Sequence, residues 1–189
     1  VFTSDNGGLI HVRNGPTDNR PLRAGKGSAY EGGVRVPAIV SWPGHIKPGA
    51  TSSEPVITCD WYPTILEVAG VSRDTRQNDG IDGVSLVPLL TPSRGVVNRR
   101  DLFWHYPHYH RGGATPYSAI RSGPWRLVEF YEDRRVELYH LGRDVSEKTD
   151  LAKTHPAKAV ELLTRLRQRR KRVGAQDPRT NPAFQSRAR

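Results

Sequence analysis

The sequence predicts an α/β protein whose later part is a smaller α+β region with an antiparallel sheet and a C-terminal helix. A β-favouring run at residues 1–4 stops at a polar, glycine-rich turn, as strands of open α/β sheets do. Three further β-favouring segments, at 117–121, 125–131 and 136–141, are joined by short turns, which is typical of an antiparallel meander. Apolar residues then recur at helical spacing over 157–173.

The segment that follows the first strand predicts a long loop. Residues 11–33 contain seven Gly or Pro and little periodicity, and loops of this length in a compact domain are usually functional or disordered. Residues 34–42 predict the next strand, where Pro37 requires an edge position or a bulge because it lacks a backbone N–H.

A helix is predicted to follow Asp60. Asp60 is the expected N-cap, Pro63 falls in the first turn, and Gly70 ends the helix. Cys59 is expected to be a small buried residue rather than a nucleophile, since no base lies near it in sequence. The predicted apolar face of the helix consists of Tyr62, Ile65, Leu66 and Ala69.

The chain divides into three predicted parts. Residues 91–100 are polar and contain Pro and Gly, as domain boundaries often do. We therefore expect a first domain over 1–100, a small C-terminal α+β subdomain over 101–174, and a basic flexible tail over 175–189. The helix of the subdomain begins near Pro156, ends at Gly174, and is expected to pack on the meander through Leu162, Leu163, Leu166 and Val173.

The net charge of +10 is concentrated at the end of the chain. Residues 161–189 carry nine Lys or Arg against two acidic residues, so the remainder is close to neutral. This distribution argues against a nucleic-acid-binding surface along the whole chain. No apolar segment approaches the roughly 18 residues of a membrane span. A chain with no Met that opens inside a predicted strand is expected to be a piece of a longer protein.

Asp5 and Asn6 are candidate metal ligands because they place two hard oxygens directly after a strand. Such oxygens suit Ca²⁺ or Mg²⁺. The alternative is an Asx turn that continues into Gly7 and Gly8, and on local grounds this simpler interpretation is favoured.

Lys26 is a candidate anion contact because Gly25 and Gly27 on either side allow close approach of a ligand. The segment is not a phosphate-binding Walker A loop, which would require Gly in place of Arg20. Taken alone, a solvated Lys in a flexible loop is the simpler interpretation.

Three histidines, His105, His108 and His110, lie within six residues of one another. The intervening Pro and aromatic residues favour an aromatic, hydrogen-bonding rim for a polar ligand such as a sugar over a metal site. Packing without a ligand remains the other interpretation.

Together these segments resemble the second half of a formylglycine-dependent sulfatase of the arylsulfatase type. The matching motifs keep the order of that family over about residues 1–152, and the C-terminal helix fits by position only. They are Thr3-Ser4-Asp5-Asn6-Gly7, the run from Pro21 through Gly25-Lys26-Gly27 and Glu31-Gly32-Gly33 to Pro37, Asp60-Trp61-Tyr62-Pro63-Thr64, Asp82-Gly83-Val84-Ser85-Leu86, and Leu138-Tyr139 followed by Asp144, Glu147 and Asp150-Leu151-Ala152.

The resemblance implies the back part of an alkaline-phosphatase-like α/β domain followed by the small subdomain. It also implies that Asp5 and Asn6 are late ligands of an active-site Ca²⁺, with Mg²⁺ an alternative, and that Lys26 contacts the sulfate ester. His105 and His108 are expected to line the substrate pocket. Arg23, Glu31 and Arg35 in the same motif are expected to fix the loop.

The nucleophile implied by the resemblance is a formylglycine made from a Cys/Ser-x-Pro-x-Arg motif, which this chain lacks. The nearest match, Leu90-Thr91-Pro92-Ser93-Arg94, has Leu at the position of the nucleophile. We therefore expect the motif to lie in an upstream segment, where the maturation enzyme would act on it. The whole protein is expected to be periplasmic or extracellular, and this chain alone is expected to be inactive.

The sequence thus predicts the C-terminal part of a calcium-assisted sulfatase that acts on sulfate esters, such as those of a sulfated carbohydrate. A phosphoesterase or phosphonate hydrolase of the same superfamily is one alternative, because phosphate and sulfate esters share charge and shape. A non-catalytic module that binds anionic glycan is the other.

Overall fold

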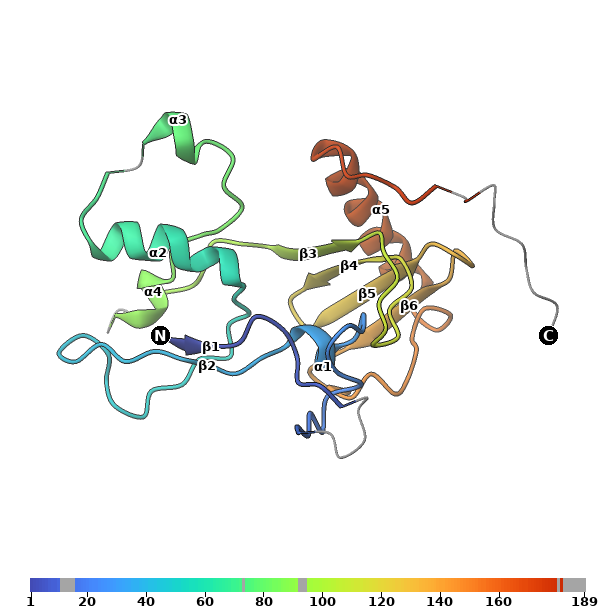
Figure 1. The fold of residues 1–189 in the computed structure, drawn as a ribbon, viewed down its shortest axis with the longest axis horizontal. Helices are drawn as coiled ribbons and strands as arrows, with labels where there is room; N and C mark the ends of the chain where they lie inside the picture. The colour runs from blue at the N-terminus through green and yellow to red at the C-terminus, as the bar shows by residue number, and fades with distance from the viewer. Residues whose placement is uncertain (11–15, 73, 92–94, 180, 182–189) are drawn as a thin grey trace. The chain divides into compact units, whose positions relative to one another are not determined.

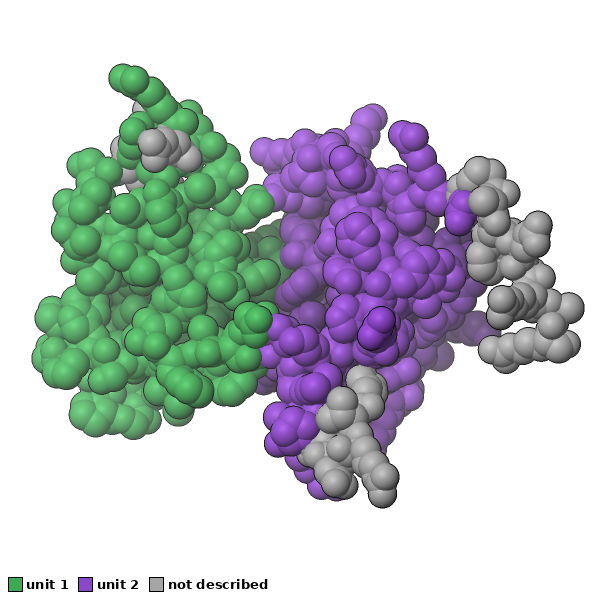
Figure 2. Space-filling view, viewed as in Figure 1, with its two compact units in different colours: residues 1–5, 36–102 green, residues 6–35, 103–189 purple. Residues whose placement is uncertain are grey.

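The computed structural model describes residues 1–10, 16–72, 74–91, 95–179 and 181. These residues form two compact units, each built from two stretches of chain: unit 1 from residues 1–5 and 36–102, unit 2 from residues 6–35 and 103–189 (Figure 2). The segment 6–35 therefore belongs with the C-terminal part of the chain. The domain boundaries expected at residues 100 and 174 stay predictions.

Unit 1 begins with a two-stranded antiparallel sheet of β1 (Phe2–Thr3) and β2 (Ala38–Ile39), in which Phe2 lies opposite Ile39. The prediction of a strand over 34–42 was too long. Pro37 has no N–H to donate, and the pairing includes only Ala38 and Ile39, while the carbonyl of Pro37 accepts a bond of 3.1 Å from the Thr3 hydroxyl.

Four short helical elements complete unit 1 (Figure 1). They are η1 (Thr58–Asp60), α2 (Trp61–Val68), α3 (Thr75–Asn78) and α4 (Val87–Leu90). The predicted helix after Asp60 is confirmed, with Gly70 just beyond its end at φ +64°. Cys59 is exposed, contrary to expectation, whereas its neighbour Asp60 is fully buried.

The carboxylate of Asp60 does not cap α2 as predicted. It instead accepts bonds from the N–H groups of Ile57 at 2.8 Å and Val84 at 3.0 Å, and pairs with both terminal nitrogens of Arg99. One buried carboxylate therefore ties together three segments of unit 1.

The predicted apolar face of α2 was also wrong. Tyr62 and Ile65 are 48% and 61% exposed, whereas Pro63 and Thr64 are buried. The Thr64 hydroxyl donates to the Asp60 carbonyl at 2.6 Å and accepts from the Leu86 N–H at 2.9 Å. These polar contacts, rather than the apolar stripe, decide which side of the helix faces inward.

Unit 2 contains most of a four-stranded sheet in the order β3-β4-β5-β6, in which β5 pairs antiparallel with both β4 and β6. The predicted meander is confirmed in β4 (Tyr117–Ser122), β5 (Trp125–Phe130) and β6 (Val136–His140). Sequence reasoning missed β3 (Asp101–Tyr106), because its aromatic and histidine residues were assigned to a ligand rim instead.

Helix α5 (Pro156–Arg172) covers one face of this sheet, as predicted (Figure 1). Leu162 and Leu166 are almost completely buried, but Val173 lies past the last turn and is 53% exposed, so its predicted place in the stripe was wrong. The core on this face consists of Ile120, Leu127, Leu138, Ala159, Leu162 and Leu166.

The opposite face of the sheet is covered by the chain around α1 (Glu31–Val34). Successive strand residues point to opposite faces, so Ala119 and Val128 form a second cluster that does not contain α5. This cluster includes Ala29 and Ala114, with Tyr30 packed against it. The loop that carries Lys26 is therefore anchored on a rigid sheet.

Candidate active-site loop around Lys26

Residues 23–33, which we call the Lys26 segment, are hydrogen-bonded to the chain that follows Asn6. The N–H of Lys26 donates to the Gly8 carbonyl at 3.0 Å, and the N–H of Gly7 donates to the Gly33 carbonyl at 3.0 Å. The side-chain amide of Asn19 donates to the Gly8 and Ala24 carbonyls at 2.9 and 3.2 Å. Unit 2 therefore brings two of the predicted site residues, Asn6 and Lys26, onto neighbouring backbones.

The close approach of these two backbones requires glycine. A Cβ on Gly7 would lie 1.8 Å from the Gly32 carbonyl oxygen, and a Cβ on Gly32 would lie 2.2 Å from the Ala24 carbonyl oxygen. Neither obstacle is a flexible side chain, so any larger residue would force the strands of chain apart. The glycines of both motifs thus serve packing as well as turn formation.

Lys26 itself presents its side chain to solvent. It is exposed, and its ammonium has no hydrogen-bond or ion-pair partner among the residues that the structure describes. A cation on a fixed backbone with an uncommitted head is suited to binding an anion.

The loop of residues 107–116 packs directly on the Lys26 segment. The N–H of Ala114 donates to the Gly27 carbonyl at 2.8 Å. Gly27 has φ +76°, and a Cβ there would lie 1.8 Å from Nδ1 of His110. The imidazole of His110, one of the three histidines of the expected rim, therefore lies against the residue next to Lys26.

The two histidines predicted to line a substrate pocket lie in different surroundings. His105, on β3, has Nδ1 2.8 Å from the Ser118 hydroxyl and Nε2 2.8 Å from the Gln176 carbonyl, so both ring nitrogens have protein partners. His108 is exposed in the loop and meets the ring of Tyr106 edge-on, with centroids 5.4 Å apart. The loop of His108 and His110 is hydrogen-bonded to the Lys26 segment through Ala114 and Gly27.

A buried ionic cluster supports the Lys26 segment from the sheet side. Arg126 of β5 is fully buried; its Nη1 donates to Glu31 at 2.9 Å and its Nη2 to the Ala29 carbonyl at 2.6 Å. Its Nε lies 3.3 Å from Oε1 of Glu147, whose other oxygen accepts the Glu31 N–H at 2.7 Å. One guanidinium thus joins two buried carboxylates, and removal of Arg126 would leave Glu147 buried without an ion-pair partner among the described residues.

Burial raises the pKa of Glu147 to about 7, and the charge of Arg126 opposes this rise. Glu147 also has φ +50°, a backbone conformation that non-glycine residues seldom adopt. The carbonyl of Glu147 accepts a 3.0 Å bond from Arg23, whose guanidinium lies 3.6 Å above the Tyr30 ring. The predicted loop-fixing role of Arg23 and Glu31 is therefore borne out, whereas Arg126 and Glu147 were not predicted to share one cluster.

Asp5 and Asn6 follow β1 where the chain passes from unit 1 to unit 2. Asp5 is exposed and Asn6 is half-buried. Among the described residues there is no group of three or more His, Cys, Asp or Glu side chains that could hold a metal ion. The two residues fit Ca²⁺ in the kind of their oxygens but supply fewer than the six to eight ligands that it takes.

Comparison with known proteins gives the family. The family model described as "N-sulphoglucosamine sulphohydrolase, C-terminal" matches residues 25–175, which include residues 25–33 of the Lys26 segment and the whole sheet of β3, β4, β5 and β6 with α5. The chain belongs to the sulfatase family. It corresponds to a C-terminal portion of these proteins, with the α/β and antiparallel elements that its sequence predicted.

Curated sulfatases agree with this assignment. A "Sulfatase" of Formosa agariphila is 39% identical over 179 residues, covering 88% of the chain and 32% of that protein. Human "Arylsulfatase A" is 39% identical over 132 residues, covering 69% of the chain and 24% of that protein. The chain therefore spans about a third or less of the length of these relatives.

Solved sulfatase structures share the fold. The structure of Ps i-CgsB in complex with k-i-k-neocarrahexaose has a TM-score of 0.73 and 31% identity, covering 88% of the chain and 35% of that protein. The structure of BT4656 in complex with its substrate D-glucosamine-2-N,6-O-disulfate has a TM-score of 0.63 and 29% identity, covering 78% and 30%. In both structures the bound ligand is a saccharide. Among the described helices of this chain, none is long and apolar enough to cross a membrane.

Proposed function

We propose that the protein to which this chain belongs hydrolyses sulfate esters of a carbohydrate, and that Lys26 binds the sulfate group. The observation that carries the proposal is the uncommitted ammonium of Lys26 on a segment locked by glycine contacts and by the buried cluster of Arg126. A fixed cation offsets charge on the sulfate oxygens and on the departing oxygen as the S–O bond breaks. The sulfatase relatives with bound saccharides support the choice of substrate class.

Asp5 and Asn6 would hold Ca²⁺, or alternatively Mg²⁺, together with ligands from outside this chain. Their carboxylate and amide oxygens are the ligand types that these ions prefer. The ion, when bound, would supply positive charge next to the sulfate oxygens. The hydrogen bonds between Gly7 and Gly33 and between Gly8 and Lys26 would hold the backbone that follows Asn6 in a fixed position relative to the Lys26 segment.

His108 is the better placed of the two predicted pocket residues, because its loop contacts the Lys26 segment while His105 has both ring nitrogens occupied. The nucleophile would be a formylglycine outside this chain, which has no Cys/Ser-x-Pro-x-Arg motif. The maturation enzyme that makes it would then be a partner of the longer protein, in a periplasmic or extracellular setting.

Replacement of Lys26 by Ala in the longer protein tests the proposal. The expected result is a fall in kcat/KM for an aryl sulfate of about 100-fold or more, the size of effect seen when one transition-state contact is removed. Lys47→Ala, at an exposed position of unit 1, is the matched control and should leave kcat/KM within about twofold. An unchanged kcat/KM in Lys26→Ala, or turnover of phosphate esters in preference to sulfate esters, would overturn the proposal.

A further inference from the structure

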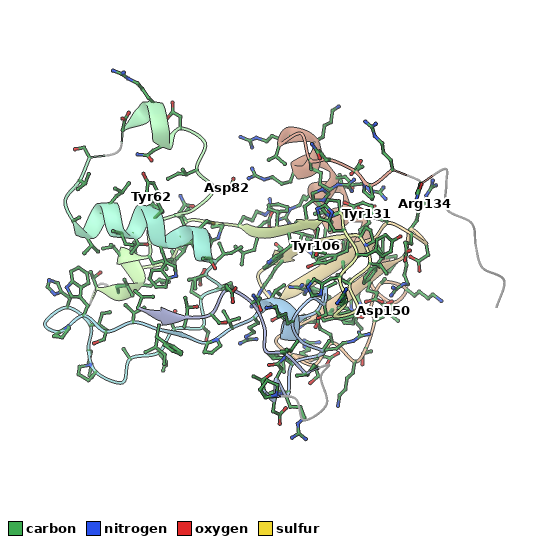
Figure 3. The ribbon with its side chains drawn as sticks, in the orientation of Figure 1. Tyr62, Asp82, Tyr106, Tyr131, Arg134 and Asp150 are labelled. Carbon is green, nitrogen blue, oxygen red and sulfur yellow. The ribbon has the colours of Figure 1, made fainter. Side chains whose placement is uncertain are left out.

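Unit 2 contains a hollow of about 1410 Å³ on the side of the sheet where α5 ends. Its walls come from three places: the loop 107–116, the turn between β5 and β6, and the end of α5 with the residues that follow it. Tyr131 and Arg134, labelled in Figure 3, belong to the turn that forms one wall. The volume exceeds the roughly 300–1,000 Å³ of pockets that hold drug-sized ligands, which leaves room for a larger ligand.

The hollow carries excess positive charge. Two of the three lining carboxylates have cationic partners: Glu129 pairs with Arg167 at 2.6 Å and with Arg170 at 3.0 Å, and Asp177 also pairs with Arg170. The third, Glu132, accepts a hydrogen bond from the Tyr109 hydroxyl. Three further lining cations have no hydrogen-bond or ion-pair partner among the described residues. These are Arg134, Lys171 and Arg179. The cations come from separate segments, so an anion in the hollow could meet more than one of them.

Arg134 is held in an unusual backbone conformation. It has φ +56°, although it is not glycine, and its side chain is exposed. Left-handed conformations of larger residues cost free energy and are enriched at ligand clamps. The turn thus fixes the backbone of this cation at the rim of the hollow, and its guanidinium has no ion-pair partner among the described residues.

Tyr109 supplies an apolar surface at the same rim. It is 68% exposed, yet its hydroxyl donates to Oε1 of Glu132 at 2.7 Å, which fixes the orientation of the ring. An exposed and oriented aromatic ring beside free cations is suited to a ligand that has both an apolar face and anionic groups. A sugar ring that carries sulfate has this combination.

The loop 107–116 connects the hollow to the Lys26 segment. Pro107, Tyr109 and Pro116 line the hollow, while Ala114 and His110 contact Gly27, next to Lys26. A ligand that spans this loop would reach both places. A monosaccharide sulfate would occupy only the position at Lys26, whereas an oligosaccharide would also extend into the hollow.

We propose that this hollow is a binding site for a second anionic sugar residue of a sulfated oligosaccharide, with Arg134 and Lys171 contacting its anionic group and Tyr109 contacting its ring. The link to the ester bound by Lys26 rests on the proposed function. Binding of an anionic sugar in the hollow does not depend on the proposed function, and it is measurable on the 189-residue chain.

Calorimetry with a heparin-derived hexasaccharide tests the proposal on that chain. The double variant Arg134→Ser/Lys171→Ser should bind about tenfold more weakly or worse, as expected for the loss of two charge-assisted contacts. Arg143→Ser/Lys153→Ser is the matched control. It removes the same charge from exposed residues of unit 2 outside the hollow, and should bind within about twofold of the wild type. Circular dichroism of each variant verifies that the fold is retained.

A second variant separates sugar recognition from general attraction of polyanions. Tyr109→Ala should weaken the hexasaccharide several-fold and leave binding of inorganic polyphosphate, which has no ring to stack, unchanged. The proposal is overturned if the hexasaccharide does not bind, if both double variants weaken it equally, or if polyphosphate and hexasaccharide respond alike to all three variants. Lys26→Ala should not alter this binding by more than about twofold, so failure of the proposed function and failure of this site give different results.

Discussion

Units 1 and 2 are stabilised in different ways. Of the seventeen buried hydrophobic residues in the described part of the chain, only Leu86, Val97 and Leu102 belong to unit 1, and the other fourteen belong to unit 2. Unit 1 is organised around the polar contacts of Asp60, whereas unit 2 has an apolar core on each face of its sheet. A sheet covered on both faces can hold a loop rigidly, which is why the Lys26 segment belongs to unit 2.

The comparison indicates that one buried, hydrogen-bonded carboxylate can hold the segments of a small unit together, as an apolar core does in a larger unit. It also predicts that the two units respond to different substitutions. Truncation of a buried apolar side chain should lower the stability of unit 2, whereas removal of a single buried carboxylate should lower the stability of unit 1 the most.

The largest effect is expected for Asp60→Ala. Arg99 is only 12% exposed and would lose its partner, at a cost of about 3 to 5 kcal/mol. Hydrogen exchange should show lost protection in α2 with protection retained in β4, β5 and β6. Asp79→Ala, an exposed carboxylate of unit 1, is the control and should change stability by less than about 0.5 kcal/mol. Equal loss of protection in both units would contradict the comparison.

Leu162→Ala should produce the next largest effect, and in the other unit. Its side chain is fully buried between α5 and the sheet, so its truncation is expected to lower the free energy of unfolding of unit 2 by about 3 kcal/mol in denaturant titration. Val160→Ala on the same helix, 65% exposed, should cost less than about 0.5 kcal/mol. Similar costs for the two variants would mean that α5 does not pack as described.

Glu147→Gln probes the ionic cluster beneath the Lys26 segment. The pKa of Glu147 is raised from 4.5 to about 7, so between these values the folded chain keeps a proton that the unfolded chain has lost. The resulting stability is complete below about pH 4.5 and is lost as the pH rises through about 7. The wild type should therefore lose on the order of 2 kcal/mol relative to the variant over this range.

Thermal unfolding of both proteins from pH 4 to pH 8 measures this difference. A difference that stays constant with pH, or one that grows in favour of the wild type as the pH rises, would show that Arg126 keeps Glu147 ionised throughout.

The smallest effect is expected for Ile65→Ser. Ile65 is 61% exposed on α2, so the free energy of unfolding of this chain should change by less than about 0.5 kcal/mol in denaturant titration. A cost above about 1 kcal/mol would place Ile65 in a core and remove the contrast between the two units.

The elements governed by local chemistry were predictable from sequence. The turn at Ser122-Gly123-Pro124 and the spacing of Leu162 and Leu166 determine the β4–β5 hairpin and the buried face of α5 from residues close in the chain. Asp60 and Lys26 were also singled out, from capping chemistry and flanking glycines, although the contacts made by Asp60 differ from those expected.

The contacts that position the candidate site were not predictable in this way. Arg126 meets Glu31 across 95 residues, and Glu147 meets Glu31 across 116, and no periodicity or turn signal reports such pairs. An Arg inside an apolar strand segment and a Glu in a loop both have ordinary solvent-exposed alternatives. Only the fold shows that all three side chains are buried together.

These long separations also set an order of events during synthesis. The Lys26 segment leaves the ribosome before its supports, Arg126 and Glu147, which emerge about a hundred residues later. Until these residues are synthesised the segment lacks the contacts that hold it, and its glycine-rich backbone is free to sample other conformations. The candidate site is therefore among the last parts of the chain to form, and premature termination anywhere before residue 147 would leave Lys26 present in sequence but not held in place.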